Sequence, residues 1–203
     1  MQKSIVLGVT GGIGSGKSLV CRVMSLLGIP IYYADDQAKY LMGNDLGLMV
    51  QIKRNFGEQA YSSKHILNRS YLSKQVFSDP EKLSLLNSLV HPVVKKSFDL
   101  WCAKMESQNH PILVKEAALL LESGSYKSLD KLIVVSSPQE LKIRRVLVRD
   151  THRAKEDVLA IMNKQWSEEK KIAKADFVIR NDETELVIPQ VNKILEDIKK
   201  AIM

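Results

Sequence analysis

The chain of 203 residues has few cysteines, few aromatic residues and no long apolar run. Its two cysteines, Cys21 and Cys102, are far apart and form no Cys-x-x-Cys pair, so neither is expected to be catalytic or to bind a metal. No stretch approaches the roughly 20 apolar residues of a membrane-spanning helix, and the N-terminus lacks the order of a secretory signal. We therefore expect a cytoplasmic protein with no membrane partner.

Aromatic residues make up 6% of the chain, although its formal net charge is +7. A nucleic-acid surface usually carries a broad basic stripe with aromatic side chains between the charges. Here the densest arginine cluster, from Arg144 to Arg153, falls within one short stretch. That placement favours a small ligand with several phosphates, and no nucleic-acid partner is expected. Solvated surface charge is the alternative.

No repeat, low-complexity tract or linker divides the chain, so we predict a single domain over residues 1–203 with a subdomain and a lid. Short apolar runs alternate with helical patterns, which predicts an α/β fold with a five-stranded parallel sheet and helices on both faces. The predicted strands are Ile5–Val9, Ile31–Tyr33, Ile112–Val114, Leu132–Val135 and Phe177–Ile179.

Residues 37–110 have a mainly helical pattern and form a long insertion between the second and third strands, typical of an acceptor-binding subdomain. A helix is predicted from Asp45 to Phe56, Asn68 and Asp79 are predicted to cap the helices after it, and His91-Pro92 is predicted to interrupt the last of them. Beyond the fourth strand, Ser137-Pro138-Gln139-Glu140 predicts a capping box with proline at the first helical position. A final helix is predicted from about Pro189, with one apolar face that could serve either the core or an interface.

The most specific motif follows the first strand and fits the pattern G-x-x-x-x-G-K-[ST]. Its residues are Gly11, Gly12, Ile13, Gly14, Ser15, Gly16, Lys17 and Ser18. Glycines let the backbone curl around a polyphosphate, with N–H groups and the helix N-terminus directed at the anion. Lys17 would reach the β- and γ-phosphates, and the Ser18 hydroxyl would bind Mg²⁺. This motif, a P-loop, predicts binding of a nucleoside triphosphate with Mg²⁺.

A P-loop leaves three classes open: GTPase, motor ATPase and small-molecule kinase. The third strand leads to Glu116 without a D-x-x-G motif, and no Asn-Lys-x-Asp is present, so a GTPase is disfavoured. A kinase needs a carboxylate near the acceptor hydroxyl, cations around the transferring phosphoryl group and a lid that excludes water. Asp35, after the second strand, would supply the carboxylate, and Arg145, Arg149 and Arg153 the cations.

The chain also resembles a known family, through a series of motifs in order. These are Thr10–Ser18, Ala34-Asp35, Leu86-Asn87 leading to His91-Pro92, Leu119–Glu122, Arg145 with Arg149-Asp150, Gln165, and Ala175–Asn181. Taken together they are similar to the dephospho-CoA kinase family over nearly the whole chain. The resemblance implies a P-loop kinase fold with a helical CoA-binding subdomain and a lid at about residues 145–166.

The implied reaction is ATP-dependent phosphorylation of the ribose 3′-hydroxyl of dephospho-CoA, the last step of coenzyme A synthesis. Asp35 would be the general base, while Lys17 and Arg145 would stabilise the transferring phosphoryl group and Ser18 would hold Mg²⁺. Besides the P-loop, ATP would contact Arg149 and Arg153 in the lid and Asn181 near the adenine. The acceptor side would comprise Thr10, Asp35, His91, Pro92, Glu116, Leu119 and Arg145.

The chain departs from the family pattern at Tyr33, Glu116 and Ala118, all on the expected acceptor side. Two alternatives remain at this point. One is another P-loop kinase acting on a small metabolite or a nucleoside monophosphate, and the other is a nucleotide-dependent regulatory or RNA-binding module. The sequence makes no prediction about oligomeric state.

Overall fold

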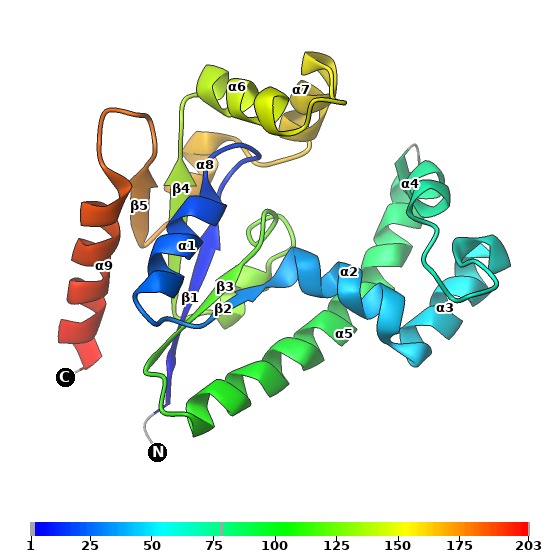
Figure 1. Cartoon of the computed structure of the whole chain (residues 1–203), viewed down its shortest axis with the longest axis horizontal. Helices are drawn as coiled ribbons and strands as arrows, with labels where there is room; N and C mark the ends of the chain where they lie inside the picture. The colour runs from blue at the N-terminus through cyan, green and yellow to red at the C-terminus, as the bar shows by residue number, and fades with distance from the viewer. Residues whose placement is uncertain (1–2, 78, 203) are drawn as a thin grey trace. The chain divides into compact units, whose positions relative to one another are not determined.

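The computed structural model describes residues 3–77 and 79–202, and these divide into two compact units (Figure 1). The α/β unit comprises the described residues up to Tyr32 and from Met105 onward, and the helical unit comprises Tyr33–Lys104. No helix of the described residues is long and apolar enough to cross a membrane.

The α/β unit is built on a five-stranded sheet with the order β2-β3-β1-β4-β5. The strands are β1 (Ile5–Thr10), β2 (Ile31–Tyr33), β3 (Ile112–Glu116), β4 (Lys131–Ser136) and β5 (Phe177–Arg180). β1 pairs in parallel with β3 and β4, and β4 pairs in parallel with β5. The carboxyl ends of these strands therefore lie along the same edge of the sheet, where open α/β sheets bind their ligands.

Consecutive strand residues are buried in the centre of this sheet. Leu132, Ile133, Val134 and Val135 of β4 are each at most 3% exposed. Since successive side chains point to opposite faces, both faces must be covered. The helices that contact strands are α1 (Lys17–Leu26), α8 (Glu168–Ile172) and α9 (Val187–Ile202), whereas α6 (Gln139–Arg149) and α7 (Lys155–Asn163) contact each other. The predicted α/β class is confirmed.

Helix α9 begins at Val187 rather than at Pro189, and its apolar face belongs to the core. Val191, Ile194, Leu195 and Ile198 are all buried, and α9 contacts α1 and β5. The open choice between core and interface for these side chains is therefore resolved in favour of the core.

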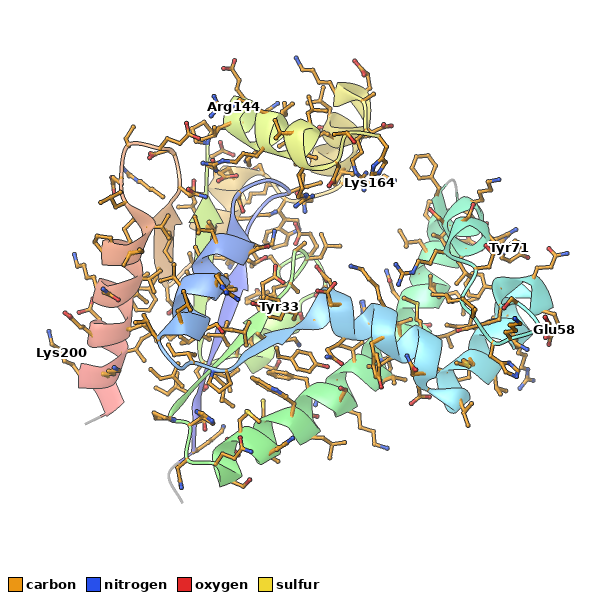
Figure 2. All side chains as sticks on the ribbon, viewed as in Figure 1. Tyr33, Glu58, Tyr71, Arg144, Lys164 and Lys200 are labelled. Carbon is orange, nitrogen blue, oxygen red and sulfur yellow. The ribbon has the colours of Figure 1, made fainter. Side chains whose placement is uncertain are left out.

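The helical unit contains α2 (Ala34–Asn44), α3 (Leu46–Phe56), a 3₁₀ turn at Glu58–Ala60, α4 (Arg69–Phe77) and α5 (Pro80–Ser107), which continues past the unit boundary. The predicted caps at Asn68 and Asp79 are confirmed, and Asp45 also caps a helix, α3. Asp45 Oδ1 accepts from the Leu48 N–H, Asn68 Oδ1 from Tyr71, and Asp79 Oδ1 from Glu81 and Lys82. Tyr71, labelled in Figure 2, also joins two helices by donating to the Phe56 carbonyl at 2.8 Å.

The predicted interruption at His91-Pro92 is wrong, because α5 runs continuously through Pro92. Proline removes one helical hydrogen bond and costs about 3 kcal/mol in a helix interior. Val90, Val94 and Phe98 nevertheless lie on one buried face that extends through the proline. Burial of this face, at roughly 1.5–3 kcal/mol per large side chain, outweighs the local cost.

Candidate active site

The P-loop connects β1 to α1 at the carboxyl edge of the sheet. Gly14 and Gly16 have φ values of 78° and 96°, a left-handed conformation that other residues rarely adopt. A Cβ atom at Gly14 would collide with the Lys142 carbonyl, and one at Gly16 with the Asn181 side chain. Glycine is therefore needed at these positions both for the turn and because other segments approach closely.

Lys17 and Ser18 open helix α1 directly after this loop. The Lys17 Nζ donates to the carbonyls of Gly11 at 3.1 Å and Gly12 at 3.4 Å, so its ammonium group lies across the loop. Ser18 is exposed, whereas Ser15 is fully buried and its Oγ has no hydrogen-bond partner among the described residues. The loop thus presents a cation and a hydroxyl at a helix N-terminus, the arrangement that binds polyphosphates.

Asn181, just beyond β5, fastens this loop from the other end of the chain. Its buried Nδ2 donates to the Ser15 carbonyl at 2.8 Å, and its own carbonyl accepts from Arg145 Nη1 at 3.0 Å. Arg145 Nη2 lies 3.4 Å from Asn181 Oδ1. The structure therefore brings the predicted site residues Asn181 and Arg145 together with the P-loop, with Asn181 as a clamp on the loop backbone.

The predicted capping box at Ser137 is wrong. Helix α6 begins at Gln139 with Pro138 as its N-cap, and no side chain caps it. The Ser137 hydroxyl instead donates to the Asn181 carbonyl at 2.8 Å and accepts from Arg145 Nη1 at 3.1 Å. The Ser137 hydroxyl is therefore engaged by Asn181 and Arg145, which are distant in sequence, and does not cap α6.

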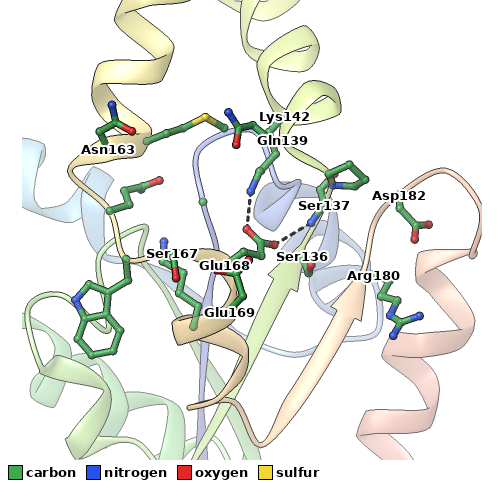
Figure 3. Close-up of a pocket in the computed structure, with 16 residues that line it drawn as sticks. Ser136, Ser137, Gln139, Lys142, Asn163, Ser167, Glu168, Glu169, Arg180 and Asp182 are labelled. Carbon is green, nitrogen blue, oxygen red and sulfur yellow. Dashed lines mark hydrogen bonds and ion pairs between the residues drawn. The ribbon is translucent and has the colours of Figure 1, made fainter.

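Behind the loop lies a polar cavity of about 710 Å³, shown in Figure 3. Glu168 links two of its walls, since it pairs with Lys142 Nζ at 2.5 Å and accepts from the Ser137 N–H at 3.1 Å. Lys142 is only 8% exposed. This ion pair connects the start of α8 to α6, the helix whose Lys142 carbonyl lies next to Gly14. The sequence predicts no role for Lys142 or Glu168.

The predicted lid at residues 145–166 packs on the P-loop through an apolar cluster. Ile143 and Val146 of α6 and Val158 of α7 form its buried centre, and Ile13 of the loop packs against them. The Ile13 N–H also donates to Gln165 Oε1 at 3.0 Å. The sequence indicates Gln165 only as part of a motif, because its partner lies far away along the chain.

Arg149 and Arg153 share one carboxylate at the end of α6. Asp150 accepts from Arg149 Nε at 2.8 Å and Nη2 at 3.0 Å, and from Arg153 Nε at 3.1 Å. Hydrogen bonding and charge from Arg149, and to a smaller extent from Arg153, lower the pKa of Asp150 to about 2. The two predicted lid arginines are thus held together by Asp150.

Glu116 ends β3 beside Val9 of β1 and is 9% exposed. The pKa of the buried Cys21 thiol is raised, first by burial and then by the negative charge of Glu116, while Lys17 opposes the shift. Both charges therefore act close to the start of α1. Nearby, the buried Thr10 donates from Oγ1 to the Ala118 carbonyl at 3.4 Å, and Leu119 is 47% exposed.

Glu122 connects the loop after β3 to the end of the predicted lid and to helix α8. Its Oε1 accepts from the Trp166 N–H at 2.8 Å and lies 3.2 Å from Lys171 Nζ. Lys171 is 1% exposed, so this is a buried ion pair. The motif Leu119–Glu122 contains Glu122, but its partners cannot be inferred from spacing.

The remaining predicted site residues belong to the helical unit. Asp35 is exposed in the first turn of α2, directly after β2, and His91 and Pro92 are exposed within α5. Thr10, Glu116, Leu119, the lid arginines and Asn181 all lie with the P-loop in the α/β unit. The predicted site residues are thus divided between the α/β unit, which contains the P-loop, and the helical unit.

Metal binding by side chains alone is not indicated, because the described residues contain no group of three or more His, Cys, Asp or Glu that could hold an ion. Ser18 and Glu116 are oxygen donors, which suit Mg²⁺ when phosphate oxygens and water supply the other ligands. The residues present therefore fit a metal that arrives with a nucleotide.

Comparison with known proteins agrees with this geometry. The sequence model of the dephospho-CoA kinase family matches residues 5–186. The dephospho-CoA kinase of Chlorobium chlorochromatii is 38% identical over 204 residues, covering 98% of this chain and 96% of that protein. A crystal structure from Thermus thermophilus aligns over all of both chains with a TM-score of 0.83 and 31% identity. The dephospho-CoA kinase from Campylobacter jejuni aligns over 98% of each chain with a TM-score of 0.71 and 26% identity.

Proposed function

The chain belongs to the dephospho-CoA kinase family, and from this membership we propose how its residues transfer the γ-phosphoryl group of ATP to dephospho-CoA. The acceptor atom is the ribose 3′-hydroxyl, as the family resemblance implies. The observation that carries the proposal is the P-loop itself, with Lys17 across it and Asn181 fastening it. ATP is the phosphoryl donor, and coenzyme A and ADP are the products.

Phosphoryl transfer depends mainly on positioning and charge stabilisation. We assign these roles to Lys17 and Arg145. Lys17 would exchange its loop carbonyl partners for phosphate oxygens, a gain because hydrogen bonds between charged groups are the stronger ones. Arg145 is already oriented by the Ser137 hydroxyl and the Asn181 carbonyl, so little side-chain freedom would be lost on binding phosphate.

The acceptor would be activated by Asp35, accepting the proton of the 3′-hydroxyl as general base. His91 and Pro92 from the helical unit, and Thr10, Glu116 and Leu119 from the α/β unit, would bind the rest of the acceptor. The exposure of Asp35 and His91, and of Leu119 at 47%, supports their availability to a ligand.

Arg149 and Arg153 would contact the phosphates of ATP from the lid and exclude water from the site. Asn181 would lie near the adenine in addition to its role as a clamp. The carboxylate of Asp150 between the two arginines supports this assignment, because it keeps both cations at one end of α6.

We also propose that ATP binds with Mg²⁺, held on the protein side by Ser18. When bound, the ion would neutralise phosphate charge. We propose a cytoplasmic location as well, on the basis of the chain's membership of a family of coenzyme A synthesis enzymes.

Coupled ADP release with purified protein, ATP and a panel of acceptors tests the function. Dephospho-CoA should give turnover far above that with AMP, adenosine or water. Equal rates with all acceptors would refute the assignment. Omitting Mg²⁺, or replacing Ser18 with alanine, should raise the KM for ATP. An unchanged KM in both cases would refute the metal site.

A further inference from the structure

Ile13, in the P-loop, is held by the lid segment in two independent ways. Its side chain packs against the cluster of Ile143, Val146 and Val158. Its backbone N–H donates to the side-chain Oε1 of Gln165, at 3.0 Å and 152 positions along the chain. Both the side chain and the backbone N–H of this one loop residue are therefore held by contacts.

The Gln165 contact fixes the part of the loop that would bind phosphate. N–H groups of a P-loop bind their anion only if successive peptide planes are correctly oriented. A bond from Gln165 to the Ile13 N–H sets the plane of the Gly12–Ile13 peptide. Gly12 is buried, and a Cβ atom there would lie 3.6 Å from Gln165 Oε1, so the side chain lies close along the loop.

The residue after Gln165 is itself anchored. The Trp166 N–H donates to Glu122 Oε1 at 2.8 Å, and that oxygen pairs with the buried Lys171. A glutamine whose backbone is tied down in this way loses less entropy in holding one rotamer than a free surface side chain would. The hydrogen bond of Trp166 thus restrains the backbone next to Gln165, while the Gln165 side chain accepts from the P-loop.

We propose that Gln165 is a positioning residue for the nucleotide, acting through the Ile13 N–H, and that it links the end of the lid to ATP affinity. The proposal rests on the proposed function, since it takes the ligand of the loop to be ATP. Because coupling is reciprocal, ATP binding must in turn alter the end of the lid, where Trp166 lies.

The direct test replaces Gln165 with methionine, which keeps the volume but removes the acceptor oxygen. The Kd for ATP, measured by calorimetry without any acceptor, should rise about tenfold, the upper range for one hydrogen bond. The Kd for dephospho-CoA alone should stay within about twofold of the original value. Gln139→Met is the matched control, because Gln139 lines the same cavity at the start of α6. An ATP Kd for Gln165→Met within twofold of the Gln139→Met value overturns the proposal.

A second readout uses Trp166 as a reporter, in a Trp101→Phe background that leaves it the only tryptophan. ATP should change its fluorescence in the parent protein, and this change should be lost in Gln165→Met even at saturating ATP. A full response in the variant contradicts the link. If Gln165→Met does not fold, Gln165→Asn decides: it withdraws the acceptor oxygen from the Ile13 N–H by one methylene group, and an unchanged ATP Kd and Trp166 response again refute the proposal.

These measurements remain distinct from the test of the function. Failure of dephospho-CoA as an acceptor would remove the proposed reaction but leave ATP affinity and Trp166 fluorescence measurable. If Gln165→Met had normal turnover and an unchanged ATP Kd, only the positioning role of Gln165 would be refuted, and the proposed reaction would stand.

Discussion

The side-chain hydrogen bonds inside the α/β unit and those inside the helical unit differ in the sequence separation of the residues they join. In the α/β unit, side-chain hydrogen bonds join residues as far apart as Asn181 and Ser15, separated by 166 positions. In the helical unit, Tyr61 donates to the Met42 carbonyl and Tyr71 to that of Phe56, over 19 and 15 positions. Polar groups near the nucleotide loop are therefore fixed by distant partners, whereas the helical unit is built from local contacts.

This difference suggests that substitutions around the loop should disturb a network, and that those in the helical unit should act singly. The buried face of α5 consists of Val90, Val94 and Phe98 in a helix of 28 residues. Large apolar side chains such as Tyr40 and Phe77 are 60% and 73% exposed. Four experiments test this contrast.

The largest effect is expected for Lys17→Ala. Loss of a cation that stabilises the transferring phosphoryl group should lower kcat by about 10³–10⁵-fold. Lys95→Ala in the helical unit is the control, because Lys95 is 69% exposed and pairs only with its helix neighbour Asp99 in the contacts described. ADP release measures both. Near-normal activity of Lys17→Ala would overturn the P-loop assignment.

Asp35→Asn tests whether the helical unit contributes a single chemical group. As a general base, Asp35 should be worth about 10²–10⁴-fold in kcat. The Kd for ATP should hardly change, since the role proposed for Asp35 concerns the acceptor hydroxyl and not the nucleotide. Asp36→Asn is the matched control on the same helix turn, where Asp36 pairs with Lys39. Equal kcat values for both variants would refute the role of Asp35 as general base and leave it only a structural role at the start of α2.

Glu122→Ala should expose the cost of breaking the buried network. The ammonium of Lys171 would be left buried without its partner, which should lower the free energy of unfolding by about 3–5 kcal/mol in urea titrations. Adding Lys171→Met should recover part of this loss. Asp99→Ala, which breaks an exposed pair in the helical unit, should cost less than about 1 kcal/mol. Similar losses for Glu122→Ala and Asp99→Ala would contradict the contrast.

The smallest effect concerns pH. The pKa of Asp150 is about 2 in the folded chain, below the ordinary value of 3.8. A lowered folded-state pKa means that the carboxylate favours folding above the ordinary pKa, and that this contribution is lost as the pH falls through about 2. A carbon NMR titration should give this value, and Arg149→Ala should move it towards 3.8. In the helical unit, burial alone raises the pKa of Tyr61 to about 12. An Asp150 pKa unaffected by Arg149→Ala would refute the cause assigned here.

The sequence predicts the framework well because continuous apolar runs and glycine patterns are local signals. All five strands, the P-loop and the caps at Asn68 and Asp79 could be predicted in this way. The errors at Pro92 and Ser137 share one reason, since in each case a tertiary environment overrides a local preference. Val90 and Val94 carry α5 through its proline, and Asn181 and Arg145 take the Ser137 hydroxyl.

The polar network of the site could not be predicted from the sequence, because spacing does not encode its partners. Nothing local to Gln165 indicates Ile13, and nothing local to Glu122 indicates Lys171. The role of Asp35 is inferred from its position after the second strand and from the family resemblance, those of His91 and Pro92 come from the resemblance alone, and all three remain predictions. The exposed positions of these residues in the helical unit agree with such roles without testing them.

The Asn181 clamp also bears on how the protein is made. The loop that it fastens is synthesised well before Asn181, which follows Ser15 by 166 positions, so the link to Ser15 can form only after the residues between them have been translated. Contacts of such long sequence separation form late, because a large loop must be closed before they contribute any energy. A nascent chain released before residue 181 would contain the entire nucleotide motif and still lack the bond that completes it. ATP affinity acquired during synthesis should therefore appear abruptly, as the last strand is added to the sheet.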